Sequence, residues 1–162
     1  MTKKNIIFTV LAVVWMIVIF VYSSRPAEES NANSDTVEKA IMQMTVTDYD
    51  EKTEKEVENF ILDWRIPIRK CAHACEYALL SFLLFFAIPD KLALWGRGLI
   101  SGAGALVYGI SDEIHQSFVP GRTALVSDVL IDLAGVCCGC LFAVVIVILV
   151  RRKRRKTRMQ KI

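Results

Sequence analysis

Four apolar runs divide the chain, and this pattern limits its fold more than any other feature. Ile6–Tyr22 forms a helix about 26 Å long if fully helical, which is near the lower limit for crossing a bilayer. The run Cys71–Ile88 is interrupted by His73 and Glu76, whereas Val129–Val150 is long enough to cross comfortably.

The third run, Gly98–Ile110, is too short to cross a bilayer by itself. It reaches full length if the helix starts near Leu92, with Arg97 extending to the surface, or if it continues into Ser111–His115. We therefore predict an all-α integral membrane protein with four transmembrane helices, at about residues 6–22, 71–88, 94–112 and 129–150.

The composition supports this fold class. Apolar residues make up 54% of the 162 residues, above the roughly 45–50% of soluble domains, and the mean hydropathy is +0.40. These values exclude a disordered chain, a collagen and a disulfide-stapled secreted module. The chain also lacks a glycine-rich phosphate loop and a nucleotide-binding domain, and we expect no nucleic-acid partner.

Charged residues are gathered in two places, and they predict the orientation in the cell membrane. Eight of the 20 Lys and Arg residues lie in Arg151–Ile162, and short basic segments stay cytoplasmic. With four spans the N-terminus, which carries Lys3 and Lys4, is cytoplasmic too. The insert 23–66 holds eleven of the 17 acidic residues and faces outward. The predicted organisation is thus one transmembrane domain, 1–150, followed by a basic cytoplasmic tail, 151–162, that contacts anionic membrane lipid.

A cleaved signal peptide is the alternative interpretation of the N-terminus. Lys3 and Lys4 followed by an apolar run resemble such a peptide, but the run is long and no A-x-A cleavage site follows it. We therefore expect the first run to stay in the membrane.

The residue pattern of the insert predicts short amphipathic helices in the first extracytoplasmic loop. Val57, Phe60, Ile61 and Trp64 recur at helical spacing, and a weaker pattern surrounds Ile41. We interpret these helices as resting on the membrane surface. The alternative is a lid over an outward-facing site.

Ionisable residues inside the second span are costly in a bilayer and mark a candidate site. Arg69, Lys70, His73, Glu76 and Tyr77 follow one another within two turns at its outer end. Four of them are spaced by three or four residues and share one helix face.

The third and fourth spans bring similar residues to the same level. Asp112 and Gln116 form a stacked pair if the third span is still helical there, and Asp128 and Asp132 form another at the start of the fourth. Further along the fourth span, Gly135 and Gly139 form a small surface for a close helix contact. We predict catalytic candidates at His73, Glu76, Asp112, Glu113, His115, Asp128 and Asp132, and substrate- or anion-binding candidates at Arg69, Lys70, Tyr77, Gln116 and Arg122.

Three explanations of this cluster remain open. It could be an ion-pair network that only fixes helix packing. It could perform acid–base chemistry on a phosphate held by Arg or Lys. It could hold a divalent metal, although neither His73-x-x-Glu76 nor Glu113-x-His115 matches a known metal motif, and we assign no metal ligand. The five cysteines are interpreted as packing residues.

Several blocks of the sequence carry a family resemblance. They are Arg69-Lys70-x-x-His73-x-x-x-Tyr77, Ser111-Asp112-Glu113-x-His115-Gln116-x-Phe118-x-Pro120-Gly121-Arg122, Asp128-x-x-x-Asp132-x-x-Gly135, and Ile19-Phe20-x-x-Ser23-Ser24-x-Pro26 at the end of the first run. On these motifs the chain resembles the VanZ-like family of integral membrane proteins. The resemblance covers the first span and about residues 69–139, outside the insert 31–66 and the tail.

The resemblance implies a role in the bacterial cell envelope. The family's namesake is associated with low-level resistance to the glycopeptide antibiotic teicoplanin, and no catalytic assignment comes with it. The first hypothesis is therefore an envelope protein that changes how a glycopeptide or a lipid-linked cell-wall precursor meets the outer membrane face. The second is an intramembrane hydrolase or transferase that acts on a lipid- or isoprenoid-linked phosphate. The third is a structural or scaffold membrane protein. The sequence assigns no cofactor.

Overall fold

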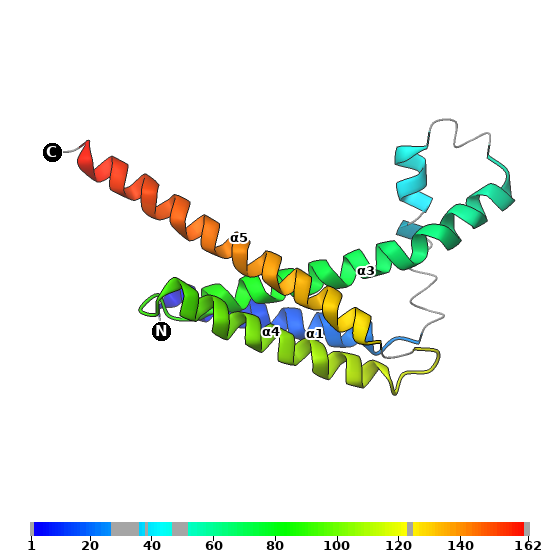
Figure 1. Ribbon diagram of the computed structural model, residues 1–162, viewed down its shortest axis with the longest axis horizontal. Helices are drawn as coiled ribbons and strands as arrows, with labels where there is room; N and C mark the ends of the chain where they lie inside the picture. The colour runs from blue at the N-terminus through cyan, green and yellow to red at the C-terminus, as the bar shows by residue number, and fades with distance from the viewer. Residues whose placement is uncertain (1, 27–35, 38, 47–51, 123–124, 161–162) are drawn as a thin grey trace.

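The computed structural model describes residues 2–26, 36–37, 39–46, 52–122 and 125–160, and the long helices of these residues are four in number. They are α1 (Lys3–Ser23), α3 (Glu54–Ala87), α4 (Leu94–Gln116) and α5 (Val126–Met159). A short helical segment at 39–45 lies in the insert, and none of the described residues forms a strand. Figure 1 shows α1, α3 and α4 packed side by side, with α5 crossing α3 and then leaving the bundle toward the C-terminus.

Capping residues define the starts of the first two long helices. Thr2 and Asn5 form a capping box before α1, and Thr53 and Glu56 form another before α3. In each box the side chain at N-cap accepts from the backbone three residues later. The upstream box explains why α3 begins at Glu54, far before the predicted start of the second span.

The prediction of a separate amphipathic helix around Val57–Trp64 is wrong. These residues form the first turns of α3, which continues through Pro67 into the second predicted span. Proline removes one helical hydrogen bond, but its fixed φ is compatible with a helix, and no glycine occurs between Glu54 and Ala87 to end one. The chain therefore enters the bundle as a long continuous helix that projects well beyond it (Figure 1).

The closest helix contact joins α3 and α5 through the two glycines singled out in the sequence. A Cβ atom added at Gly135 would fall on the carbonyl oxygen of Ala74, and one added at Gly139 would fall on that of Ala78. Only glycine allows this approach, as expected for a G-x-x-x-G surface. The contact sets how α5 is placed against the polar face of α3.

Three helices in the described part of the chain, α1, α3 and α5, are long and apolar enough to cross a bilayer. The predicted third span corresponds to α4, which is not among them because polar side chains lower its hydropathy. Arg97, Ser101 and Asp112 of α4 are buried inside the bundle, whereas Leu99 and Val107 are 66% and 67% exposed. The surface that α4 presents is thus apolar even though its sequence is mixed.

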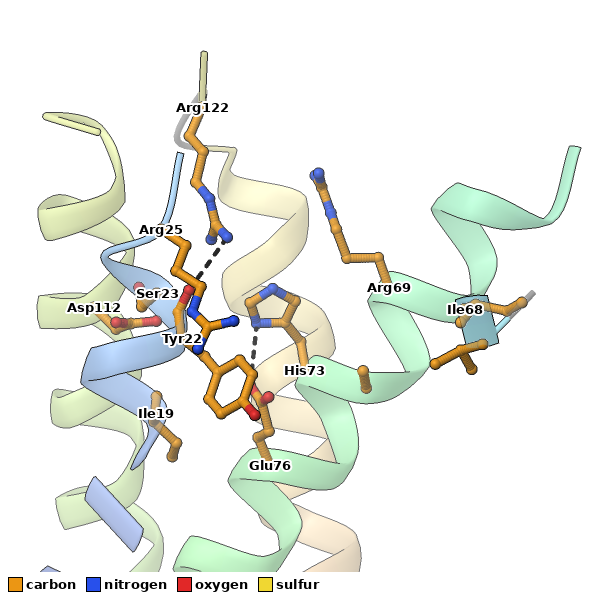
Figure 2. Close-up of a pocket in the computed structure, with 12 residues that line it drawn as sticks. Ile19, Tyr22, Ser23, Arg25, Ile68, Arg69, His73, Glu76, Asp112 and Arg122 are labelled. Carbon is orange, nitrogen blue, oxygen red and sulfur yellow. Dashed lines mark hydrogen bonds and ion pairs between the residues drawn. The ribbon is translucent and has the colours of Figure 1, made fainter. Parts of the chain in front are cut away.

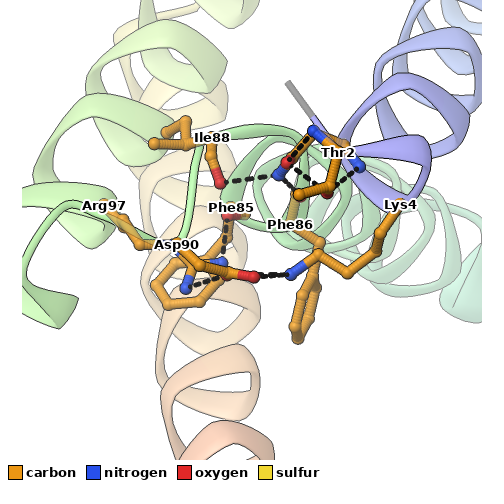
Figure 3. Close-up of polar contacts among 8 residues, drawn as sticks. Thr2, Lys4, Phe85, Phe86, Ile88, Asp90 and Arg97 are labelled. Carbon is orange, nitrogen blue, oxygen red and sulfur yellow. Dashed lines mark hydrogen bonds and ion pairs between the residues drawn. The ribbon is translucent and has the colours of Figure 1, made fainter.

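A compact ion-pair cluster joins three segments at one end of the bundle (Figure 3). Lys4 Nζ donates to Asp90 Oδ2 at 2.7 Å, and Arg97 Nη1 lies 2.8 Å from Asp90 Oδ1. Arg97, only 1% exposed, also donates to the carbonyl oxygen of Phe85 at 2.9 Å and lies over the Phe85 ring. We call Lys4, Asp90 and Arg97 the inner cluster.

Candidate functional site

A cavity of about 210 Å³ lies at the opposite end of the bundle, where α1 and α4 end. Its walls come from α1 and the residues just after it, from α3, from α4, from the loop before α5, and from the insert. The lining residues are Ile19, Tyr22, Ser23, Arg25, Val37, Ile68, Arg69, Ala72, His73, Glu76, Asp112 and Arg122. Figure 2 shows the polar members gathered around one space, with His73 near its centre.

The α3 wall carries one polar face, as the residue spacing predicts. Arg69, His73 and Glu76 all line the cavity. His73 Nδ1 lies 3.8 Å from Glu76 Oε2, which is close enough for an ion pair but too long for a hydrogen bond. Trp15 of α1 donates its indole N–H to the backbone carbonyl of Glu76 at 2.9 Å, which ties α1 to this part of α3. The wall is thus held in place from outside the cavity.

Asp112 of α4 faces α3 and is held by two donors. The Tyr77 hydroxyl donates to Asp112 Oδ2 at 3.0 Å, and Gln116 Nε2 donates to the same oxygen at 2.8 Å. Tyr77 is fully buried, and Gly109 leaves room for its ring, since a Cβ there would lie 3.2 Å from it. The predicted stacked pair Asp112 and Gln116 is therefore present. Tyr77 and Gln116 orient Asp112 rather than line the cavity themselves.

Arg122 enters the cavity from the turn after α4. Gly121 adopts a positive φ of 77°, a conformation that glycine favours, and this turn directs the chain back toward α1. Arg122 Nη2 donates to the carbonyl oxygen of Tyr22 at 3.5 Å. Burial, and then the positive charge of Arg69, lower the pKa of the Arg122 guanidinium. Two guanidinium groups therefore share the mouth of the cavity (Figure 2).

The other predicted residues lie at the same end of the bundle but outside the cavity lining. Glu113 Oε1 accepts from the backbone N–H of Leu125 at 2.7 Å, just before α5. Lys70 pairs with Asp128 at 3.9 Å. His115 Nε2 lies 3.1 Å from Ser24 Oγ. Its ring also packs against Phe20 of α1. These contacts join the ends of different helices, so the four residues have partners that stabilise the packing of the bundle.

Asp132 is buried beside the site rather than on its wall. It is 3% exposed, and its Oδ1 has no hydrogen-bond partner among the described residues. A Cβ at Gly109 would lie 3.6 Å from Asp132 Oδ2 and 3.2 Å from the Tyr77 ring, so both side chains pack at this glycine.

Sequence reasoning missed the contribution of the first helix. Tyr22, Ser23 and Arg25 line the cavity, and Arg25 lies over the Tyr22 ring at 4.5 Å. Tyr22 was predicted as the last residue of the first apolar run, whereas Ser23 and Arg25 were considered part of the acidic insert. The motif at the end of the first span, which contains Ile19 and Ser23, was the available signal. Val37 of the insert also lines the cavity.

The side chains present are suited to acid–base chemistry and to binding an anion. His73, Glu76 and Asp112 can exchange protons, and Arg25, Arg69 and Arg122 can hold negative charge. Within the described residues, no three His, Cys, Asp or Glu side chains come together so as to hold a metal ion. The five cysteines are free thiols, and none lines the cavity.

Comparison with known proteins bears on the same elements. The family model described as VanZ/LLP1 matches residues 8–149, a range that runs through the insert and ends just before the basic tail. No curated protein and no solved structure matches the chain. The matched range includes every residue that lines the cavity. The cavity is therefore a feature of the matched region, and the chain belongs to the VanZ/LLP1 family.

Proposed function

We propose that the protein crosses the cell membrane four times, with both termini in the cytoplasm and the cavity at the extracytoplasmic end. The end of α5 carries six consecutive basic residues, 151–156, and Lys4 lies at the same end of the bundle, which favours a cytoplasmic location for this end. The apolar outer face of α4 supports α4 as the third of these four spans, since its polar residues face the other helices.

In this orientation the protein acts at the outer surface of the cell envelope. We propose that the cavity alters how a glycopeptide antibiotic, teicoplanin in particular, or a lipid-linked cell-wall precursor meets the outer face of the membrane. The protein thereby lowers susceptibility to the antibiotic. The observation that carries this proposal is the cavity itself, because acid–base groups and arginines from separate elements meet there in a chain of the VanZ/LLP1 family.

Expression in a susceptible host tests this function. The wild-type chain should raise the inhibitory concentration of teicoplanin, and Asp112→Asn should remove the gain because the cavity loses an oriented carboxylate. Asp63→Asn is the matched control, since Asp63 is exposed on the projecting part of α3 and does not line the cavity. An unchanged inhibitory concentration, with the wild-type protein inserted in membranes, would contradict the resistance role.

A second candidate function is an intramembrane hydrolase or transferase. The arrangement of His73 and Glu76 favours an enzymatic role. These two side chains lie 3.8 Å apart and line one cavity with Asp112, so a proton donor and a proton acceptor can both reach a substrate bound there. Comparing the lipid and peptidoglycan intermediates of expressing cells with those of His73→Ala cells tests this function. His115→Gln is the control, because His115 lies outside the cavity lining. Identical intermediates in all strains would contradict an enzymatic role.

A further inference from the structure

Two buried donors at the cavity have no partner. The hydroxyl of Ser23 and the Nε of Arg122 make no hydrogen bond within the described residues. Ser23 is only 4% exposed, yet it lines the cavity. Leaving a buried donor without an acceptor is unfavourable, so each of these groups calls for a partner. Arg122 Nε can only donate, and the Ser23 hydroxyl can donate as well as accept, so one acceptor would satisfy both groups.

The charge at the mouth of the cavity identifies the kind of acceptor. Arg25, Arg69 and Arg122 all line it, and within the described part of the chain Arg69 and Arg122 make no ion pair. Guanidinium groups close to one another repel, and a bound anion offsets that cost. Arginine matches the planar oxygens of carboxylate and phosphate especially well.

The charges of the two cavity carboxylates, Asp112 and Glu76, raise the pKa of Arg122, but within the described residues neither carboxylate forms an ion pair with Arg69 or Arg122. Asp112 accepts from Tyr77 and Gln116, and Glu76 lies against His73. Figure 2 shows Arg69 and Arg122 above His73 and Glu76 below it. The cavity therefore has a cationic mouth and an acid–base floor.

Apolar residues complete the wall beside the arginines. Ile19 of α1 and Ile68 and Ala72 of α3 line the same cavity. In addition, the outer surface of α1 is apolar along its length, with Ile17 and Phe20 at least half exposed. A free phosphate ion gains nothing from such a wall, whereas a lipid places its head group among the arginines and its chain against the apolar residues.

We propose that Ser23 and Arg25 act with Arg69 and Arg122 to bind the phosphate group of a membrane lipid, whose hydrocarbon chain lies against Ile19 and Ile68. The inference rests on the proposed function for its placement in the outer leaflet and names the ligand of that site. Ser23 and Arg25, absent from the predicted site, are binding residues that act on the ligand directly.

Binding measurements with the purified full-length chain in phosphatidylcholine nanodiscs test the proposal. The probes are phosphatidic acid, inorganic phosphate, and oleate as an anion without phosphate. Phosphatidic acid should bind more tightly than the other two. Inorganic phosphate binding as tightly as phosphatidic acid would overturn the assignment to a lipid, and oleate binding as tightly would overturn the assignment to phosphate.

Variants separate the cavity from the rest of the basic surface. Ser23→Ala and Arg122→Gln should each weaken phosphatidic acid binding about tenfold, the loss expected for a hydrogen bond to a charged group. Lys55→Gln is the matched control and should leave binding unchanged, because Lys55 is exposed on the projecting part of α3 and does not line the cavity. Equal binding by wild type, Ser23→Ala and Arg122→Gln would overturn the proposal.

Two further comparisons separate misfolding of a variant from loss of lipid binding, and the lipid site from the proposed function. Ser23→Ala removes only a hydroxyl, and Arg122→Lys keeps the charge while it loses the planar fork, so these two variants keep the test valid if Arg122→Gln misfolds. If phosphatidic acid does not bind but Asp112→Asn still abolishes the teicoplanin gain, the ligand assignment is wrong and the proposed function stands. If phosphatidic acid binds through Ser23 but the antibiotic gain is absent, the proposed function is wrong and the lipid site stands.

Discussion

The two ends of the bundle use arginine in opposite ways. At the inner cluster, Arg97 is almost completely buried, bonds to Asp90 and to the Phe85 carbonyl, and stacks on the Phe85 ring. At the cavity, Arg122 makes a single hydrogen bond of 3.5 Å, and Arg69 makes none with the described residues. One end satisfies its positive charge from within the chain, and the other leaves it available.

This difference separates a structural role from a binding role. The inner cluster connects α1, the loop between α3 and α4, and α4 itself, so it stabilises their arrangement. The cavity arginines have no comparable set of partners, and they gain little by being there unless a ligand binds. Buried charge is therefore not enough to identify a functional site, because the partners of the charge decide the matter.

The largest effect on stability is expected at the contact between α3 and α5, because this contact holds both ends of the bundle in place. Gly139→Val would place a side chain on the Ala78 carbonyl and should destabilise the fold by about 3 kcal/mol or more, since neither backbone can move freely. Gly102→Ala is the control, because its Cβ would meet side chains at an ordinary 3.6 Å. Thermal unfolding in detergent measures both. Equal stability of the two variants would show that the helix contact is looser than described.

The next test compares the two arginines directly. Arg97→Met should cost about 2 kcal/mol of stability, because it removes one partner of a buried ion pair whose other member is half exposed. Arg122→Met should cost less than about 1 kcal/mol, since it loses one long hydrogen bond and relieves repulsion with Arg69. Thermal unfolding without added lipid distinguishes them. A larger loss for Arg122→Met would remove the distinction between the two ends.

The sequence predicted the helices well but not their full extent. The predicted spans at 6–22 and 129–150 lie within α1 and α5, because long apolar runs leave few alternatives. The continuity of the amphipathic segment with the second predicted span was missed, since Pro67 and the charged residues around it suggest an interruption of the helix. Hydropathy also undervalues α4, whose polar residues are hidden only after the helices pack.

The candidate site was predicted in part, for a clear physical reason. Spacing along a helix shows that His73 and Glu76 share a face, but it does not show which neighbour that face meets. His115 was grouped with Asp112 by depth, yet it contacts Phe20 of α1 and Ser24 just after α1, whereas Asp112 faces α3. Residues at one level of the bundle can thus face different neighbours, because the rotation of each helix decides which of them meet.

A pair of tyrosines sharpens the comparison with smaller effects. Tyr77→Phe removes the hydrogen bond to Asp112, and Tyr108→Phe removes one to the Met16 carbonyl, so each should cost about 1 kcal/mol of stability. Only Tyr77→Phe should also reduce the teicoplanin gain, because it frees a carboxylate of the cavity. An equal loss of function in both variants would indicate that stability alone controls the activity.

The smallest effect concerns pH at the inner cluster. The hydrogen bond from Lys4, and then the positive charges of Lys4 and Arg97, lower the pKa of Asp90 from its ordinary value of 3.8. A lowered pKa stabilises the folded state above the ordinary value, and the gain is lost as the pH falls through the lowered value.

Because Asp90 is 53% exposed, solvent screens the interaction, and the loss should be below about 1 kcal/mol. Unfolding curves in detergent between neutral and strongly acidic pH measure this loss, with Asp90→Asn as the comparison. The variant should be less stable at neutral pH and should converge on the wild type in acid. Since the cavity carboxylates are present in both proteins, their own titration cancels in the difference. A constant difference at every pH would mean that Asp90 stabilises the fold through packing rather than through its charge.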